Sequence, residues 1–295
     1  MYQEKRVSVS GSFFLAGDYD MIFLMQKILI QGELGSFHHE AAIKLFGSDI
    51  EIIPCSSFTS VFAQIDNDIL GLVAIENSLY GSINEVYDLL EKSDAKIIAE
   101  TELSIHQNLI TLPGAALADI REVYSHPVAL AQCENYLANN LPHAEKVEFE
   151  DTAAAVRHIT ERNDPSLAAI ASRAAAELYN TQILAPQIED NPVNFTRFVA
   201  LSKAPERHRA LVQQPQAGKS SITLITGHQP GALYEALGVF VSHQVNLTKL
   251  QSRPIIGEKW HYRFYLDFEA SEDETELVIS DLKSLDNNVV FLGNY

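Results

Sequence analysis

The sequence is short of cysteine and of basic residues. It contains two cysteines, Cys55 and Cys133, which are too few for a disulfide framework and fit a reducing, cytoplasmic location. Lysine and arginine number 21 against 39 acidic residues, for a formal charge of −18. Because nucleic acids and anionic membranes bind basic surfaces, neither is an expected partner. An anionic substrate must therefore be attracted by a local site.

The sequence also lacks long apolar runs and the common cofactor motifs. No stretch reaches the roughly 18 apolar residues that span a bilayer. There is no Walker-type loop, no CxxC pair and no HExxH spacing, so neither a metal nor a cofactor is expected. The adjacent His38 and His39 would point in different directions on a helix and chelate poorly. Residues 1–24 faintly resemble a signal peptide, but Asp18 and Asp20 interrupt the apolar part, and we interpret the segment as a poorly ordered extension.

Short apolar runs alternate with helical periodicity between residues 25 and 203. Strands are expected at 27–31, 50–55, 70–77, 96–103 and 106–113, and in a second round at 122–124, 146–150, 167–172 and 195–203. Helical segments separate most of them. This alternation predicts an α/β domain of two lobes, with a cleft between the lobes for a small ligand.

A linker and a smaller unit complete the predicted organisation. Residues 204–218 hold two prolines and three glutamines without clear periodicity, which is typical of a linker. From 219 to 295 the expected order is strand, helix, strand, strand, helix, strand, which is the ferredoxin-like βαββαβ arrangement. The chain is thus expected to divide into an extension at 1–24, a two-lobed domain at 25–203, a linker and a domain at 219–295.

Small polar residues lie at the ends of several predicted strands. They are Glu76, Asn77 and Ser78 after one strand, Ser125 after another with Gln132 beyond it, and Asn194, Thr196 and Arg197 at the start of the last. Gly35 and Ser36 lie in a loop before a helix, where free backbone N–H groups can hold an anion. Each residue taken singly is more simply a cap or a turn. Taken together, they predict polar groups that converge at one edge of the sheets.

Six ordered segments resemble the signature segments of prephenate dehydratases. They are GELGSFHHEAA, AIENSLYGSI, YSHPVALAQC, EDTAAA, AAIASRAAAELY and NFTRF, all between residues 27 and 203. The later segments GALYEAL and NLTKLQSRP resemble the phenylalanine-binding ACT domain that follows in this family. The resemblance implies a two-lobed, periplasmic-binding-protein-like (type II) catalytic domain followed by an ACT domain. It also implies conversion of prephenate to phenylpyruvate, in phenylalanine biosynthesis, without a cofactor.

The resemblance assigns catalytic roles to four residues, Thr196, Asn77, Ser125 and Gln132. Thr196 matches the threonine of the family's TRF motif, and its weakly acidic hydroxyl is better suited to donate a hydrogen bond than a proton. Further substrate contacts are expected from Glu76, Ser78, Gly35, Ser36, Asn194, Arg197 and Phe198. Neighbouring strand residues face opposite ways, so Arg197 becomes structural if Thr196 faces the cleft. His38 stands where the family commonly has a small hydroxyl residue.

The resemblance also implies an effector site for phenylalanine between two chains, and hence a homodimer or homotetramer. One chain would contribute Gly231, Ala232 and Leu233, and the other Asn246, Leu247, Gln251, Ser252, Arg253 and Pro254. Gln251 replaces the glutamate of the family's ESRP segment, which removes a negative charge. Phenylalanine is still expected to inhibit.

Three alternatives remain. A solute-binding protein would share the two-lobed plan, but it does not account for the ACT-like segments. An arogenate dehydratase would perform the same chemistry on the aminated substrate, and the sequence does not choose between the two substrates. A sensor without catalysis is disfavoured by the intact sequence from Thr196 to Phe198.

Overall fold

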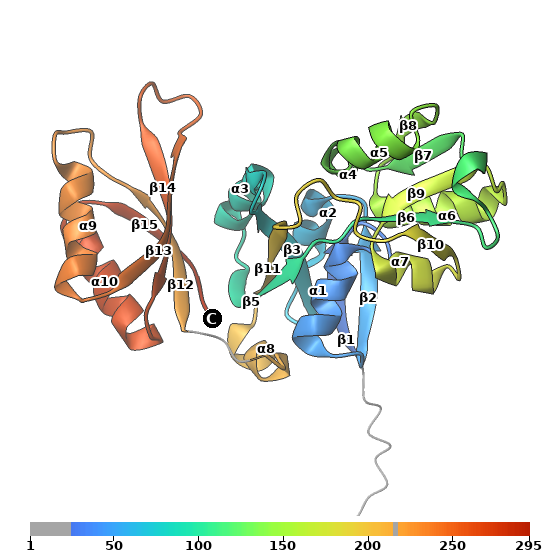
Figure 1. Ribbon diagram of the computed structural model, residues 1–295. Coiled ribbons are helices and arrows are strands. Elements are labelled where there is room, and N and C mark those ends of the chain that lie inside the picture. Colours follow the sequence, from blue (N-terminus) through green and yellow to red (C-terminus); the bar gives the residue numbers. More distant parts are fainter. Residues whose placement is uncertain (1–24, 215–217) are drawn as a thin grey trace, which may run out of the picture.

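The computed structural model describes residues 25–214 and 218–295. The predicted extension at 1–24 and residues 215–217 of the predicted linker lie outside the described part. Within residues 25–214 and 218–295, the chain forms two lobes and a C-terminal unit (Figure 1). None of the helices described is long and apolar enough to cross a membrane.

The first lobe is a sheet with helices on both faces. Its strands are β1 (Gln26–Gln31), β2 (Ile50–Cys55), β3 (Ile69–Asn77), β4 (Gly81–Ser82), β5 (Lys96–Ser104) and β11 (Phe195–Ser202). They run in the order β5-β11-β3-β1-β2, with β4 paired to β3. The helix α1 (Phe37–Phe46) packs on one face, and α2 (Phe58–Gln64) and α3 (Asn84–Lys92) pack on the other. Because both faces are covered, the middle of β3 is an unbroken apolar run.

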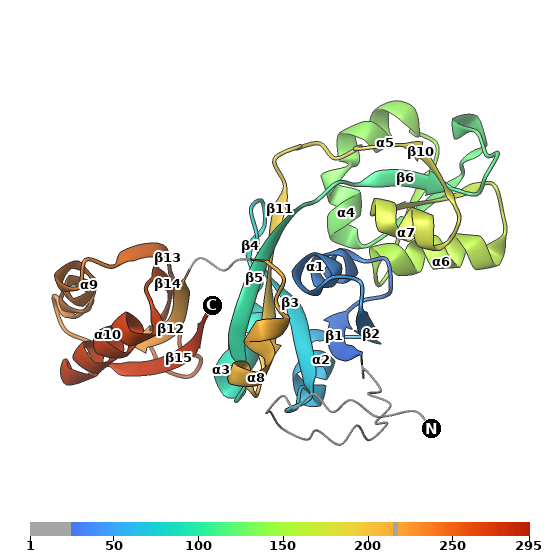
Figure 2. The same cartoon turned by 90° about the horizontal axis from the view of Figure 1, so that it is seen from below.

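The second lobe is a smaller sheet with the order β10-β6-β9-β7-β8. Its strands are β6 (Asn108–Thr111), β7 (Glu122–Ser125), β8 (Glu145–Glu148), β9 (Leu167–Ala171) and β10 (Gln182–Ala185). Its helices are α4 (Pro127–Gln132), α5 (Glu134–Asn140), α6 (Thr152–Arg162) and α7 (Arg173–Leu178). The chain passes between the lobes twice, from β5 to β6 and from β10 to β11 (Figure 2).

The C-terminal unit has the predicted βαββαβ order. It comprises β12 (Lys219–Ile225), α9 (Ala232–Ser242), β13 (Asn246–Pro254), β14 (Tyr262–Glu269), α10 (Glu272–Ser284) and β15 (Asn288–Asn294). The strands run β13-β14-β12-β15, and both helices lie on the face turned away from the lobes (Figure 1). The other face of the sheet is therefore left to meet the first lobe.

A single residue pair joins the sheet of the C-terminal unit to the sheet of the first lobe. Gly293 of β15 pairs in parallel with Ile97 of β5, so the C-terminal sheet continues into that of the first lobe. A Cβ atom at Gly293 would lie 2.2 Å from the carbonyl oxygen of Ile97. The close approach therefore requires glycine at this position.

Several short elements differ from the sequence-based expectation, among them β4, β10 and a helix in the predicted linker. The strand β10 was not predicted, because its four residues show neither alternation nor full burial. The predicted linker contains a short helix, α8 (Pro205–His208), followed by a 3₁₀ turn at Arg209–Leu211. Pro205 favours this helix start, since its fixed φ suits the first helical position. The division into domains at residues 203 and 219 stays a prediction.

Candidate active site

A cavity of about 580 Å³ lies between the two lobes. The first lobe contributes Ser36, His38, Ser57, Phe58, Asn77, Ser82, Thr196 and Phe198, among others. The second lobe and the adjoining crossover contribute Gln107, His126, Gln132, Asp151 and Thr152. None of the described residues that line it is lysine or arginine. A bound anion would therefore have to be held by donors other than lysine and arginine, beside the carboxyl groups of Glu85, Glu150 and Asp151.

Thr196 and Asn77 meet on the cavity side of the first sheet. They are directly opposed in the antiparallel pair of β11 and β3, and opposed residues point to the same face. The Asn77 Nδ2 group donates a hydrogen bond to Thr196 Oγ1 at 2.9 Å. Among the described residues, none accepts a hydrogen bond from Thr196. Its hydroxyl hydrogen is thus available to a ligand in the cavity.

The orientation of Asn77 is fixed by its other hydrogen bonds. Its Nδ2 group also contacts Asn194 Oδ1 at 2.8 Å and the Phe195 carbonyl at 3.1 Å. Its Oδ1 accepts from the backbone N–H groups of Leu79 and Tyr80 at 3.0 and 3.1 Å. Because the amide nitrogen faces acceptors and the amide oxygen faces donors, the amide cannot flip. Asn77 is therefore a fixed donor to Thr196.

His38 is a buried residue whose tautomer is set by the backbone. Strand β1 ends before it can pair with Ala74, and the Ala74 N–H donates to His38 Nε2 at 3.0 Å. The imidazole hydrogen is then on Nδ1. The ring also packs edge-on against Phe198, with centroids 5.1 Å apart. Burial lowers the pKa of His38 to about 3, so the side chain is a neutral wall of the cavity and not a proton donor.

The lowered pKa of His38 predicts a loss of stability in mild acid. The unfolded histidine gains a proton below about pH 6.5, whereas the folded one stays neutral to about pH 3. Stability therefore falls as the pH drops, by about 1.4 kcal/mol per unit. Between pH 6.5 and pH 4.5 the His38→Asn variant is expected to lose roughly 2 kcal/mol less than the wild type. Urea unfolding at the two pH values measures this, and parallel losses in both proteins would refute it.

The glycine loop contacts the second lobe, and three of its backbone N–H groups have partners within the protein. The backbone N–H groups of Gly32, Gly35 and Ser36 already donate to Cys55, His39 and Glu33. A Cβ atom at Gly32 would lie 2.6 Å from Asp151 Oδ2 in the second lobe. The expectation that this loop cradles an anion with these groups is wrong, because they have partners. Gly35 does not line the cavity, whereas Ser36 does.

Several of the predicted catalytic and substrate-contacting residues lie away from the cavity. Ser125 is buried and donates to the Ile170 carbonyl at 2.6 Å in the neighbouring strand. Ser78 accepts from the Phe195 N–H at 2.9 Å, and Asn194 supports Asn77. These three residues hold the strand ends in place and do not line the cavity.

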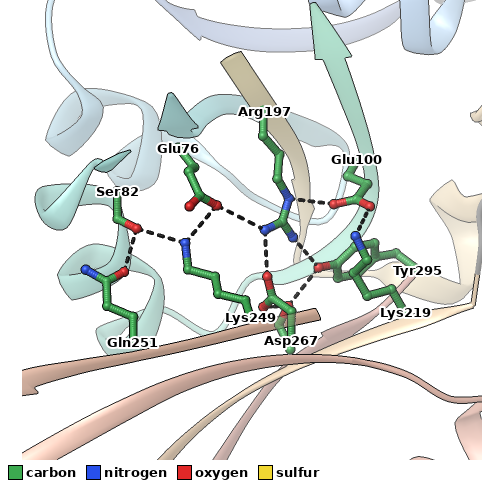
Figure 3. Close-up of polar contacts among 10 residues, drawn as sticks. Glu76, Ser82, Glu100, Arg197, Lys219, Lys249, Gln251, Asp267 and Tyr295 are labelled. Atoms are coloured by element: carbon green, nitrogen blue, oxygen red, sulfur yellow. Dashed lines mark hydrogen bonds and ion pairs between the residues drawn. The ribbon is translucent and has the colours of Figure 1, made fainter. Parts of the chain in front are cut away.

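Glu76 and Arg197 are also absent from the cavity, because each is one residue away from a lining residue on its strand. They lie on the opposite face of the sheet, where the C-terminal unit packs (Figure 3). Arg197 was expected to contact the substrate, or to be structural if Thr196 faced the cleft. The structure shows the second arrangement. Phe198, two residues beyond Thr196, does line the cavity.

The sequence interpretation missed polar residues of the second lobe. Gln107 Nε2 donates to Gln132 Oε1 at 3.2 Å, and both line the cavity. Asp151 accepts from the Ala153 and Ala154 N–H groups as the cap of α6. It also faces the cavity, and burial raises the pKa of its carboxyl. The EDTAAA segment was the available signal for it.

A second cavity, of about 500 Å³, lies in the C-terminal unit. It is lined by the predicted Gly231, Ala232 and Leu233, together with Trp260, Phe264 and others. The predicted β13 residues Asn246, Leu247, Gln251, Ser252, Arg253 and Pro254 do not line it in the single chain. Instead, Gln251 and Arg253 contact the first lobe at Ser82 and Asp88. Whether a second chain brings its β13 to this cavity stays a prediction.

Comparison with known families and relatives gives a consistent result. The family model described as prephenate dehydratase matches residues 28–206. A prephenate dehydratase of Methanocaldococcus jannaschii is 38% identical over 277 residues, covering 92% of this chain and 98% of the relative. A chloroplastic arogenate dehydratase/prephenate dehydratase of Arabidopsis thaliana is 36% identical, covering 91% and 72%.

Two solved structures resemble this chain over most of its length. A prephenate dehydratase of Arthrobacter aurescens in complex with L-Phe superposes with a TM-score of 0.76 at 28% identity, covering 91% of this chain and 89% of the other. A chain described as a novel type of quorum quenching acylase also has a TM-score of 0.76 at 28% identity, covering 91% and 97%.

Proposed function

The chain belongs to the prephenate dehydratase family, and we propose that the cavity between its lobes converts prephenate to phenylpyruvate. The ring hydroxyl leaves, the ring carboxylate departs as carbon dioxide, and the electron pair of the broken C–C bond completes the aromatic ring. The hydroxide takes a proton and becomes water. Because aromatisation drives the reaction, the protein has to position the substrate and stabilise the leaving oxygen.

The proposal depends mainly on the direction of the hydrogen bond between Asn77 and Thr196. Asn77 donates to Thr196 Oγ1, which directs the threonine hydrogen away from Asn77 and toward the cavity. A donor held at this place stabilises the negative charge that develops on the leaving hydroxyl oxygen. The apolar side chains of Phe58 and Phe198 line the same cavity and suit the ring that becomes aromatic. Ser36, Gln107 and Gln132 supply neutral polar groups for the carboxylates.

A steady-state assay tests the proposal. The purified chain is mixed with prephenate, and phenylpyruvate formation is followed by ultraviolet absorbance. Turnover of prephenate supports the assignment. Binding of prephenate without turnover would instead support a solute-binding function. A parallel assay with arogenate compares kcat/KM for the two substrates, since the Arabidopsis relative is named for both activities.

Regulation by phenylalanine is part of the same proposal. The Arthrobacter neighbour is described in complex with L-Phe, and the cavity beside Gly231 offers an apolar wall for a phenyl ring. Tyr234 and Val241 on α9 and Leu250 on β13 are exposed, which suits a homodimer or homotetramer formed through the C-terminal units. The cytoplasm is the proposed location. Inhibition by phenylalanine and the mass in light scattering test the first two points.

A second candidate activity is acyl hydrolysis at a separate site. Ser104 Oγ lies 3.2 Å from His106 Nε2, and His106 Nδ1 lies 2.8 Å from Glu189 Oε1. The Glu189 side chain is buried, and its carboxylate accepts a hydrogen bond from the Gln107 N–H at 2.9 Å. This is the arrangement of nucleophile, base and orienting carboxylate that acyl transfer uses. Ser104 and His106 border a small cavity that also contains Arg173, and a structural neighbour is described as an acylase.

A fluorophosphonate probe tests this second candidate. The wild type is expected to be labelled on Ser104 and to cleave an activated acyl ester, with both signals lost in the Ser104→Ala variant. Prephenate turnover is expected to remain in that variant, because Ser104 does not line the larger cavity. Absence of labelling in the folded wild type would remove the candidate.

A further inference from the structure

Neighbouring residues of β3 and β11 point to opposite faces of the first sheet. One face borders the substrate cavity, and the other contacts the C-terminal unit. Thr196 opposes Asn77, and the next pair along the strands is Arg197 opposite Glu76. Because successive strand residues point to opposite faces, Thr196 and Asn77 face the cavity while Arg197 and Glu76 face the C-terminal unit. The backbone segments that carry the catalytic pair are thus the segments that the C-terminal unit contacts.

Arg197 is bonded to both units. Its Nε donates to Glu100 at 2.6 Å in the first lobe, and its Nη1 and Nη2 donate to Asp267 at 2.6 Å and to Tyr295 at 2.7 Å in the C-terminal unit (Figure 3). Lys219 of the C-terminal unit pairs with the same Glu100. Burial by itself would lower the pKa of the guanidinium, but these neighbouring acidic groups raise it above its ordinary value, so the side chain stays charged. Removing Asp267 or Tyr295 from contact would leave Arg197 partly desolvated and short of partners.

Lys249 of β13 forms the second connection. Its Nζ lies 2.7 Å from Glu76 Oε2 and donates to Ser82 Oγ at 2.8 Å. Ser82 in turn donates to Gln251 Oε1 at 2.5 Å. Ser82 lines the substrate cavity and pairs with Glu76 through β4. Residues of strand β13 therefore contact Glu76, which is next to Asn77, and Ser82, which lines the cavity; Figure 3 shows these contacts.

The charged groups around Arg197 and Glu76 sum to zero only when those of the first lobe and those of the C-terminal unit are counted together. The first lobe supplies Arg197 with Glu76 and Glu100, for a net −1, and the C-terminal unit supplies Lys219, Lys249 and Asp267, for a net +1. A shifted arrangement that kept these groups buried but separated the pairs would leave uncompensated charges, which is costly. Docking is therefore expected to favour a small number of well-defined arrangements.

We propose that Lys249 and Arg197, acting on Glu76 and the ends of β3 and β11, are positioning residues that couple effector binding in the C-terminal unit to the alignment of Asn77 and Thr196. The inference rests on the proposed function. Strand β13 carries both the docking residue Lys249 and the predicted effector segment. An effector that moves this strand changes the contacts to Glu76 and Ser82, and it inhibits by the difference in its affinity for the two arrangements.

The test compares two variants that each remove one ion pair between the units. Lys249→Met keeps the length of the side chain but loses the contacts to Glu76 and Ser82. Arg263→Met is the matched control, because Arg263 pairs at 2.6 Å with Glu91 of α3, away from the catalytic strand ends. The measured quantity is the fold-inhibition of kcat/KM for prephenate at saturating phenylalanine, with phenylalanine binding followed separately by calorimetry.

Lys249→Met is expected to lower the fold-inhibition at least about fivefold, with phenylalanine still bound. Arg263→Met is expected to keep the wild-type value, and Lys249→Arg to restore most of it. Equal fold-inhibition in the Lys249→Met and Arg263→Met variants would overturn the inference. A wild type that does not turn over prephenate, or that phenylalanine does not inhibit, would instead contradict the proposed function.

Discussion

Replacing Thr196 by valine is expected to lower kcat for prephenate by roughly 10²- to 10³-fold, with a much smaller change in KM. Valine keeps the shape of threonine and loses the hydroxyl. Its loss removes the donor that Asn77 orients toward the cavity, and that donor acts most strongly on the charge that develops on the leaving oxygen. An interaction made mainly in the transition state appears in kcat when it is lost.

The serine variant is the matched control for this prediction. Thr196→Ser keeps the hydroxyl on the same Cβ and is expected to retain activity within about tenfold of the wild type. Steady-state kinetics on the wild type and the two variants gives the three kcat values, and circular dichroism confirms that each protein is folded. A Thr196→Val enzyme with near wild-type kcat would show that the leaving oxygen has another donor.

The Asn77→Asp substitution is expected to lower kcat by roughly 10²-fold while leaving Thr196 in place. A carboxylate only accepts hydrogen bonds, so the introduced side chain would take the hydrogen of Thr196 and withdraw it from the substrate. The new carboxylate would also bring an oxygen toward Asn194 Oδ1 and the Phe195 carbonyl, which the amide nitrogen now contacts. Stability is therefore expected to fall by about 3 kcal/mol.

A double-mutant cycle separates reversal of the hydrogen bond from general damage. If the introduced carboxylate acts by capturing the Thr196 hydrogen, then Thr196→Val in the Asn77→Asp background should cost little further kcat. If the two effects multiply, the residues act independently and the proposed polarity is wrong. Urea unfolding of each variant shows whether the native state is populated in the kinetic assay.

The order of elements follows from local patterns in the chain. Buried strands such as β3 and β9 are apolar runs, and helices such as α6 begin at a side chain that caps them. The βαββαβ order of the C-terminal unit was predicted for the same reason, since each element carries its own periodicity. Short elements without a strong pattern, such as β10, were missed because tertiary pairing stabilises them.

The strand alternation between Thr196 and Arg197 was predicted, but the sequence did not show what lies behind the sheet. Arg197 is bound by Asp267 and Tyr295, which are 70 and 98 residues away along the chain. In the same way, Ser125 was expected at the site because it follows a predicted strand and matches a motif of the family, whereas the neighbouring strand β9 provides the acceptor for its hydroxyl. Contacts of this kind depend on which strands become neighbours, and local sequence carries little information about that.

By itself, the sequence determined the family, the α/β character of the lobes and the C-terminal unit, because these follow from ordered motifs and from the periodicity of single elements. It also singled out Thr196 and Asn77 as candidate site residues. The tertiary structure decided which predicted residues reach the cavity, the direction of the hydrogen bond between Asn77 and Thr196, and the docking of the C-terminal unit on Arg197 and Glu76. Those properties depend on pairing register and on charges brought together by the fold, and they exist only once the chain has folded.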